Sequence, residues 1–276
     1  MSQVKSVLIT GCSTGIGLDA ALTLKQQGFD VYATARKVQD VENLRELGLN
    51  SKLLDLTDEL SIKNALIWVL EQTGGSLHAV FNNGAFGQPG AIEDLPTTAL
   101  KEQFETNFFG WHNLTKQVIP IMRQQGFGRI IQNSSVLGLV AMPYRGAYNA
   151  SKFAIEGYTD TLRLELRGTD IQVSLIEPGP IESQFRANAL EKFKQYIDMD
   201  GSVHKDKYAP QVARLASKKT GTPFTLPSSA VSKKLLHALT AKKAKTRYYV
   251  TFPTYLMAYL KRLLPVSWLD AILVKN

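Results

Sequence analysis

A glycine-rich turn that directly follows a short apolar stretch constrains the fold more than any other feature of this sequence. The stretch, Lys5–Ile9, has the composition of a buried strand, and residues 10–17 read Thr-Gly-Cys-Ser-Thr-Gly-Ile-Gly before a helical pattern begins. Glycines at a strand-to-helix turn let the backbone approach an anion, which the N-terminus of the helix also favours. The pattern predicts a βα unit that binds a pyrophosphate, and a tight turn without a ligand remains the alternative.

The rest of the chain alternates short apolar stretches with helical ones, as in a parallel sheet covered by helices on both faces. The 276 residues, 44% of them hydrophobic, suffice for one substantial core but are few for two domains of typical size. We therefore expect a single α/β domain over residues 1–276, built on one Rossmann-type doubly wound parallel sheet. The predicted strands are Ser6–Thr10, Val31–Thr34, Lys52–Leu54, Ala79–Phe81, Gly128–Asn133, Gln172–Ile176 and Tyr248–Thr251.

Tyr148 and Lys152, four residues apart in a helical segment, place a phenol and an ammonium on one helix face. A tyrosine has an unperturbed pKa of about 10, so it exchanges protons near neutral pH only if a nearby cation stabilises the phenolate. Lys152 is suited to that role. Taken alone, the pair has an ordinary alternative, which is a core aromatic residue beside a solvated charge.

The two motifs together resemble those of the short-chain dehydrogenase/reductase family, and the resemblance extends over residues 5–184. Asn107 matches the family's helix asparagine and Ser135 its catalytic serine, in the family's chain order. The resemblance implies hydride transfer by a nicotinamide cofactor, coupled to proton transfer between Tyr148 and a carbonyl or alcohol oxygen. It assigns Ser135 to orienting that oxygen, Lys152 to lowering the pKa of Tyr148 and holding the ribose, and Asn107 to anchoring a water.

The same resemblance assigns further residues to the cofactor. Asp55 matches an aspartate near the adenine amine, and a helix cap before Glu59 is the alternative. The family's Asn-Asn-Ala-Gly turn reads Asn-Asn-Gly-Ala at 82–85, and its Pro-Gly-x-x-x-Thr segment ends in serine at 178–183. The expected cofactor-binding residues are Gly11, Ser13, Thr14, Gly15, Ile16, Gly17, Arg36, Lys37, Asp55, Leu56, Asn83, Gly84, Tyr148, Lys152, Pro178, Gly179, Ile181 and Ser183.

Charge at the end of the second predicted strand indicates which nicotinamide cofactor binds. NAD enzymes of this type place an acidic residue there for the ribose 2′-hydroxyl, and a carboxylate would repel a 2′-phosphate. The segment Asp30–Ala35 instead runs into Arg36 and Lys37. Because an arginine can bind a phosphate through two parallel hydrogen bonds, we predict NADP(H). Two merely solvated cations are the alternative.

Composition argues against several other classes of protein. The N-terminus lacks the pattern of a signal peptide, and the single cysteine, Cys12, excludes an internal disulfide, so we expect a cytoplasmic protein. The four histidines show no metal-ligand spacing, and no metal is predicted. A net charge of +8 is compatible with nucleic-acid binding. No recognition motif accompanies the lysines, however, so we do not expect a nucleic-acid partner.

Two regions lie outside the family's common core. Residues 182–227 are long and polar, and we expect them to form a lid whose aromatic side chains either wall the substrate or pin the segment to the core. Residues 254–276 read as two amphipathic helices, each too short to span a bilayer. We favour packing of this tail on its own domain or a second subunit over peripheral membrane attachment, and we expect a homodimer or homotetramer.

These patterns predict an NADPH-dependent carbonyl reductase that acts reversibly on aldehydes or ketones with an apolar body. The tail and residues 174–180 are similar to those of bacterial NADP-dependent aldehyde reductases and of retinol and hydroxysteroid dehydrogenases. One alternative is a 3-oxoacyl-thioester reductase of lipid metabolism, whose chain ends soon after the last strand. The other is a cofactor-sensing scaffold without turnover, against which the complete set of Asn107, Ser135, Tyr148 and Lys152 argues.

Overall fold

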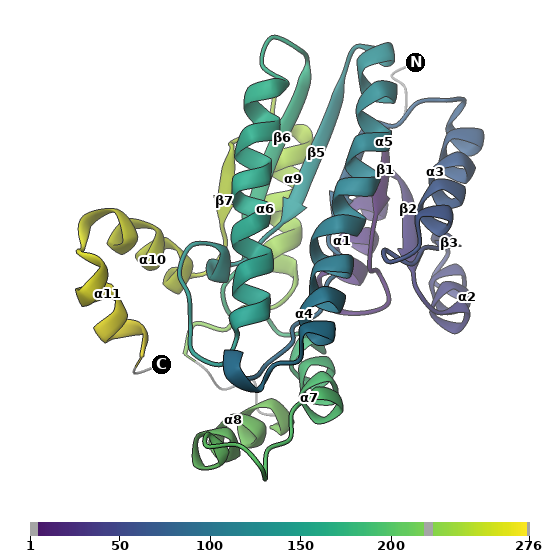
Figure 1. Ribbon diagram of the computed structural model, residues 1–276. Helices are drawn as coiled ribbons and strands as arrows, with labels where there is room; N and C mark the ends of the chain where they lie inside the picture. The colour runs from purple at the N-terminus through teal and green to yellow at the C-terminus, as the bar shows by residue number, and fades with distance from the viewer. Residues whose placement is uncertain (1–4, 218–222, 275–276) are drawn as a thin grey trace.

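A computed structural model describes residues 5–217 and 223–274 of the chain. Within these residues, seven parallel strands form one sheet with helices on both faces (Figure 1). The predicted doubly wound α/β fold is therefore confirmed, and every predicted strand is present. The strands are β1 Ser6–Ile9, β2 Asp30–Ala35, β3 Asn50–Leu53, β4 Ala79–Asn82, β5 Gly128–Asn133, β6 Ile171–Glu177 and β7 Arg247–Tyr249.

The strands lie in the order β3-β2-β1-β4-β5-β6-β7. The chain builds outward from β1 to β3 and then returns to the other side of β1, so that Val7 pairs with both Val31 of β2 and Ala79 of β4. In open parallel sheets, ligands bind in the crevice at such a reversal, outside the carboxyl ends of the strands. The turns that follow β1 and β4 therefore border the candidate site.

Alternation along the strands divides the core into two layers. Val7 and Ile9 of β1 face one layer, and Leu8 between them faces the other. Since helices cover both faces, β1 and β4 are buried along their whole length. The first layer contains α1 Gly15–Gln26, α2 Val38–Glu46 and α9 Ser229–Thr240. The second contains α3 Glu59–Thr73, α5 Gly110–Gln125 and α6 Gly146–Glu165.

An irregular turn joins α4 (Thr97–Phe104) to α5. Residues Glu105–Phe109, labelled η2, wind as a π-helix rather than an α-helix. Such wide turns are rare and frequently lie at functional sites. The fully buried Asn107 is in this turn, so the irregularity coincides with a predicted catalytic residue. The connections also include two 3-10 turns, η1 at Ile92–Asp94 after β4 and η3 at Val136–Gly138 after β5.

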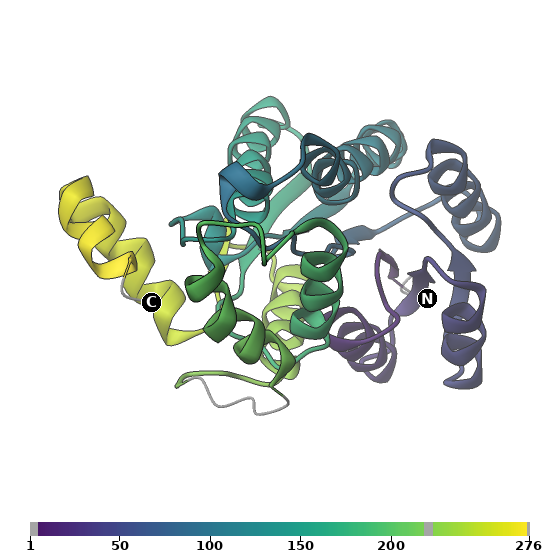
Figure 2. The ribbon, with the colours of Figure 1, turned by 60° about the horizontal axis from the view of Figure 1, so that its bottom comes forward.

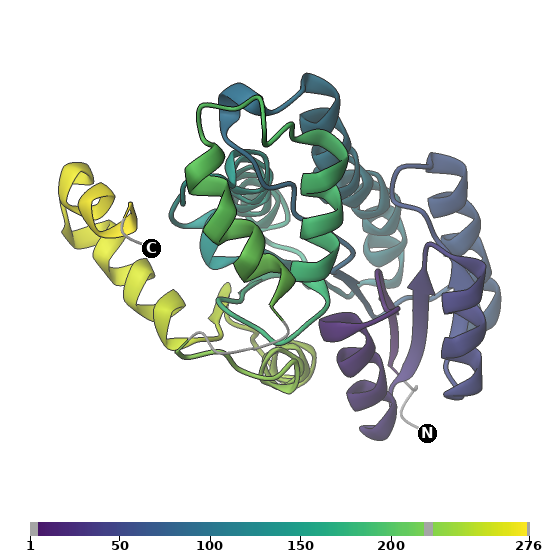
Figure 3. The ribbon, with the colours of Figure 1, turned by 90° about the horizontal axis from the view of Figure 1, so that it is seen from below.

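The described part of residues 182–227 forms two helices that cross the carboxyl edge of the sheet (Figures 2 and 3). Phe193 and Tyr208 are buried there together with Ala91 and Ile197. These two aromatic side chains therefore pin the segment to the body of the protein, one of the two roles expected for them. The helices are α7 Phe185–Tyr196 and α8 Lys205–Ala216.

Two helices at the end of the chain, α10 Phe252–Leu263 and α11 Val266–Leu273, form an arm that projects from the body beside β7 (Figures 1 and 2). The predicted helix pair is confirmed. Its packing on the chain's own domain is partial. Thr254 and Ala258 of α10 are buried and Tyr255 packs on Tyr249 of β7, while Leu263 is 76% and Trp268 64% exposed. In the part of the chain described, no helix is long and apolar enough to cross a membrane.

Candidate active site

The glycine turn after β1 has a backbone that side chains would obstruct. Gly11 and Gly15 have φ values of +70° and +58°, and a Cβ on Gly17 would lie 2.1 Å from the carbonyl oxygen of Gly11. The Thr14 side chain does not cap α1, and the first turn of α1 holds no acidic residue. The helix N-terminus therefore keeps its N–H groups and its positive dipole end for an external anion, as the pyrophosphate of a dinucleotide requires. Ser13 and Thr14 are exposed at this turn.

Asn83, at the end of β4, supports the glycine turn. Its Nδ2 donates to the carbonyl oxygens of Thr10 at 2.9 Å and Gly11 at 3.1 Å. Its Oδ1 accepts a hydrogen bond of 2.8 Å from Nδ2 of Asn133 on β5. The structure thus gives the Asn83 side chain a supporting position beneath the predicted cofactor site and joins the ends of β1, β4 and β5.

The inverted Gly84-Ala85 order has a packing reason. A Cβ on Gly84 would lie 2.9 Å from Cδ1 of Leu56, and the backbones of Gly84 and Gly11 are in close approach. The carbonyl oxygen of Gly84 also accepts a 2.8 Å hydrogen bond from Nε1 of Trp111. Glycine at position 84 therefore lets Leu56, the glycine turn and α5 meet at one point.

Two charged sites lie toward the β2 and β3 side. Arg36 and Lys37 follow β2 directly and are exposed. Asp55 accepts hydrogen bonds from the backbone N–H and the hydroxyl of Thr57, at 2.9 and 2.8 Å. The cap of α3 is Asp58, whose carboxylate accepts from the N–H of Leu60, so the helix-capping alternative for Asp55 is wrong.

The segment after β6 closes the other side of the crevice. The carbonyl oxygen of Pro178 accepts a 2.8 Å hydrogen bond from the N–H of Val136, and a Cβ on Gly179 would overlap the hydroxyl of Thr251. Ile181 forms a bridge with Leu226. The Cβ of Ser183 is 3.0 Å from the position that a Cβ on Gly15 would occupy. The predicted residues 178–183 therefore reach across to the glycine turn.

Lys152 is buried between α5 and α6 with one hydrogen-bond partner from the sheet. It is 1% exposed, and its Nζ donates to the carbonyl oxygen of Asn133 at 2.8 Å. Nζ also lies 4.5 Å from the ring centroid of Trp111 and 5.6 Å from that of Tyr148. Burial lowers the pKa of Lys152 to about 7, while the charge of Glu156 acts in the opposite direction.

Tyr148, one helical turn before Lys152 on α6, has a pKa raised to about 12 by burial. A hydrogen bond from Ser135 and the positive charge of Arg145 oppose that rise. Ser135 lies two residues after β5, and its Oγ also accepts a hydrogen bond from the N–H of Leu137 at 3.1 Å. Sequence reasoning missed Arg145, although a cation three residues before Tyr148 at the start of the same helix was a signal for it.

Asn107 uses its side chain to hold the chain after β4. Its Oδ1 accepts from the N–H of Phe86 at 3.1 Å, and its Nδ2 donates to the carbonyl oxygen of Phe86 at 2.9 Å. Nδ2 is also 3.3 Å from Oγ of Ser151 on α6. The structure therefore places Asn107 in the wall of the site, next to the helix that bears Tyr148 and Lys152.

Helix α7 contributes one ring to the site. Phe185 packs edge-on against Tyr148 with ring centroids 5.3 Å apart, and it lies where a side chain on Gly87 would be. On the outer side of α7, Lys192 pairs with Glu102 of α4 at 2.5 Å, and the Tyr196 hydroxyl donates to the same carboxylate at 2.6 Å. The helix is thus held over Tyr148 by polar contacts to α4.

The His, Cys, Asp and Glu side chains of the described residues bear on metal binding and on thiol chemistry. No group of three or more His, Cys, Asp or Glu side chains in residues 5–217 and 223–274 could hold a metal ion. Cys12 is fully buried, and burial raises the pKa of its thiol to about 12, so it packs as an apolar residue.

Comparison with known proteins agrees with this geometry. Residues 5–194 match the family model described as short chain dehydrogenase. The uncharacterized oxidoreductase YbbO of Escherichia coli (strain K12) is 44% identical over 269 residues, which are 98% of this chain and 94% of that protein.

Two solved structures of similar proteins hold nicotinamide cofactors. A short chain dehydrogenase/reductase from Burkholderia phymatum in complex with NAD has a TM-score of 0.77 at 23% identity, over 95% of this chain and 94% of that one. A variant of actinorhodin polyketide ketoreductase with NADPH has a TM-score of 0.73 at 26% identity, over 91% and 97%. With the family model covering more than half of its length, the chain belongs to the short-chain dehydrogenase/reductase family and is an oxidoreductase of that family.

Proposed function

We propose that the protein is an NADPH-dependent carbonyl reductase for aldehydes or ketones with an apolar body, which also oxidises the corresponding alcohols. The observation that carries the proposal is the chain of contacts from the catalytic side chains to the glycine turn. Lys152 binds the Asn133 carbonyl, the Asn133 side chain binds Asn83, and Asn83 binds the carbonyl of Gly11. A dinucleotide held by the turn would thus have its reactive end beside Tyr148.

The nicotinamide cofactor would supply the hydride in this reaction. Tyr148 donates its hydroxyl proton to the substrate oxygen, and Ser135 hydrogen-bonds the same oxygen to fix its orientation. The resulting phenolate is stabilised by the Ser135 hydroxyl and the positive charge of Arg145. Lys152, with a pKa of about 7, can gain or lose a proton near neutral pH and so take part in returning the proton to Tyr148.

The charge at the end of β2 supports NADP(H) over NAD(H). The side chains of Arg36 and Lys37 are exposed where a dinucleotide's adenosine ribose would lie in a doubly wound sheet. No carboxylate follows Ala35 before them. Two cations without an acid favour a 2′-phosphate, and Arg36 can bind it through paired hydrogen bonds.

The surroundings of Tyr148 support a substrate with an apolar body. Phe185 presents its ring to Tyr148, and the ring occupies the space that a side chain at Gly87 would take. If the carbon atoms of a substrate replaced the Phe185 ring against Tyr148, the tyrosine would remain shielded from water. In this proposal α7, held by Glu102, acts as the lid over the substrate.

We also propose that the protein acts in the cytoplasm as a homodimer or homotetramer. The single cysteine fits a reducing compartment. The exposed apolar side chains of the C-terminal arm, Tyr259, Leu263 and Trp268 among them, supply a surface that a second subunit would cover.

The test is the consumption of NADPH and of NADH with aliphatic, aromatic, retinoid and steroid carbonyls, each measured by the absorbance of the reduced cofactor. We expect turnover with NADPH that improves as the apolar body grows. Turnover restricted to 3-oxoacyl thioesters would replace the proposal by a reductase of lipid metabolism. NADPH binding without turnover of any carbonyl would indicate a cofactor-sensing scaffold.

A further inference from the structure

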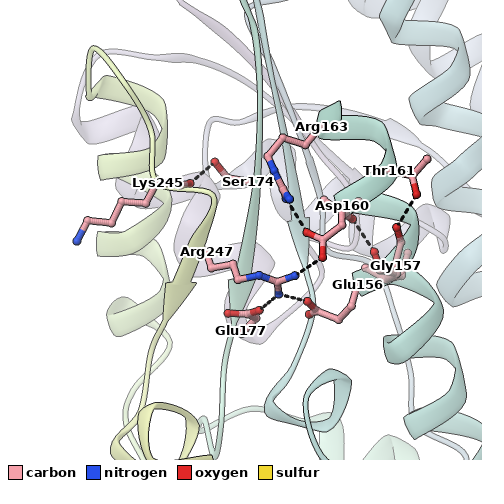
Figure 4. A network of polar contacts seen from close by, with 11 residues as sticks. Glu156, Gly157, Asp160, Thr161, Arg163, Ser174, Glu177, Lys245 and Arg247 are labelled. Atoms are coloured by element: carbon pink, nitrogen blue, oxygen red, sulfur yellow. Dashed lines mark hydrogen bonds and ion pairs between the residues drawn. The ribbon is translucent and has the colours of Figure 1, made fainter. Parts of the chain in front are cut away.

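Arg247 of β7 is surrounded by three carboxylates, two from α6 and one from β6 (Figure 4). Its Nη1 pairs with Glu156 and, at 2.5 Å, with Glu177 of β6, while its Nη2 pairs with Asp160 at 2.7 Å. The side chains of Glu177 and Glu156 are 0% and 10% exposed, whereas Asp160 is 41% exposed. Two of the three carboxylates are therefore removed from water and depend on this arginine.

Glu156 connects this group to the catalytic residues. Its second carboxylate oxygen accepts a hydrogen bond from the hydroxyl of Ser134. Ser134 stands between Asn133, whose carbonyl holds Lys152, and Ser135, which hydrogen-bonds Tyr148. A carboxylate on α6 thereby fixes the last residues of β5 against the helix that bears the tyrosine and the lysine.

The packing around Glu156 leaves it little freedom. A Cβ on Gly138 would lie 2.9 Å from Cγ of Glu156 and 2.8 Å from the hydroxyl of Ser134. The turn after Ser135 therefore closes over the carboxylate. Glu156 is also four residues after Lys152 on α6, so its charge lies one helical turn from the buried ammonium.

Of the three carboxylates, that of Glu156 is one helical turn from Lys152, whereas Asp160 is two turns away and Glu177 lies on β6. Burial and the nearby charge of Glu156 raise the pKa of Glu177, and the charge and hydrogen bond of Arg247 oppose that rise. The Arg247 guanidinium stays positively charged near neutral pH. The titratable groups of described residues that act on Glu156 or Lys152 are Tyr148, Glu156, Lys152 and Asp160 of α6, Glu177 of β6, Arg247 and Tyr249 of β7, and Lys261 of α10.

We propose that Glu156, oriented by Arg247, is a positioning residue that holds Ser134 and Ser135 in place and supplies the negative charge facing Lys152. Its importance for turnover rests on the proposed function. Its effect on the protonation of Lys152 does not, and can be measured without cofactor or substrate.

The experiment follows the pKa of Lys152 by NMR in protein labelled with carbon-13 at the lysine Cε, with Lys152→Met to assign the signal. Lys152 is distinguished from ordinary lysines because its pKa is about 7. In Glu156→Gln we expect this pKa to fall by about one unit, since a negative charge one helical turn away is lost. An unchanged pKa in folded Glu156→Gln would overturn the proposal.

Asp160→Asn is the matched control, because it also removes one carboxylate from Arg247 but lies two turns from Lys152 and does not contact Ser134. We expect its Lys152 pKa to match the wild type, and an equal fall in both variants would refute a specific role for Glu156. If Glu156→Gln does not fold, Glu156→Asp moves the charge away by one methylene. That variant should lower the pKa of Lys152 by a smaller amount, and no change in it would contradict the proposal.

Discussion

Phe185 and Tyr148, which are 37 residues apart in the sequence, meet edge-to-face with ring centroids 5.3 Å apart. This contact brings the first turn of α7 onto the phenol from which the proposed reaction takes its proton. It contributes to the burial that raises the pKa of Tyr148. The position of α7 therefore bears on the pKa of the Tyr148 phenol.

Replacement of Phe185 by alanine should lower the pKa of Tyr148 from its value of about 12, because water then reaches the phenol. A spectroscopic tyrosinate titration of the variant, compared with the same variant carrying Tyr148→Phe, measures that pKa. Phe224→Ala is the control, since Phe224 belongs to the same segment but packs on Phe252. A pKa that stays near 12 in Phe185→Ala would show that α7 does not control the tyrosine.

Tyr148→Phe should retain the fold and cofactor binding but lose turnover by about 100-fold or more, as expected for the removal of a general acid. Thermal melting and NADPH fluorescence titration check the first two properties, and the rate of NADPH consumption checks the third. Near-normal turnover would remove Tyr148 from the mechanism.

Arg36→Ala should weaken NADPH binding by about 1.5–3 kcal/mol, the range for a hydrogen bond to a charged group, and leave NADH binding nearly unchanged. Fluorescence titration with both cofactors measures the difference. Arg123→Ala, which removes an exposed arginine at the far end of α5, provides the control. Equal losses for the two cofactors would mean that Arg36 does not bind the 2′-phosphate.

Glu177 should make the stability of the protein depend on pH. Burial and the charge of Glu156 raise its pKa from the ordinary 4.5 to about 8 in the folded protein, so folding takes up a proton between these pH values. The free energy of unfolding contributed by this group is therefore greatest below pH 4.5 and falls as the pH rises toward 8. Urea unfolding across that window should show a smaller decline for Glu177→Gln than for the wild type. Glu165→Gln, on the exposed face of α6, is the control, and equal declines in all three proteins would contradict the expectation.

The double variant Leu263→Ser and Trp268→Ser should dissociate the proposed oligomer, since each side chain loses about 1.5–3 kcal/mol of apolar burial at a subunit contact. Sedimentation measures the mass, and Leu60→Ser, at an exposed leucine of α3, is the control. Unchanged mass together with lost binding to anionic liposomes would favour a membrane contact for the arm instead.

The local parts of the site could be predicted from the sequence. The glycine turn and the spacing of Tyr148 and Lys152 express the geometry of one turn and one helix, which neighbouring residues determine. Asp55 shows the limit of such reasoning, because two aspartates precede α3 and only the backbone path makes Asp58 the cap.

The parts that depend on distant residues could not be predicted. Glu156 and Arg247 are 91 residues apart, and no spacing rule joins a helix residue to the last strand of a sheet. The amphipathic pattern of residues 254–276 predicts packing on the domain or on a second subunit and does not distinguish the two. Tyr255 of α10 packs on Tyr249 of β7, whereas Leu263 and Trp268 remain exposed.

The π-helical turn at Glu105–Phe109 sets the rotational phase between α4 and α5. Before this turn, α4 presents Glu102 to α7 and Gln103 to Phe86, and after it α5 presents Trp111 to Gly84. Deleting one residue from this turn would rotate α4 relative to α5 by about 100°. Glu102 and Gln103 would then no longer face α7 and Phe86, while Trp111 would still face Gly84. The π-helical turn therefore aligns the contacts that hold α7 with the contact that supports Gly84.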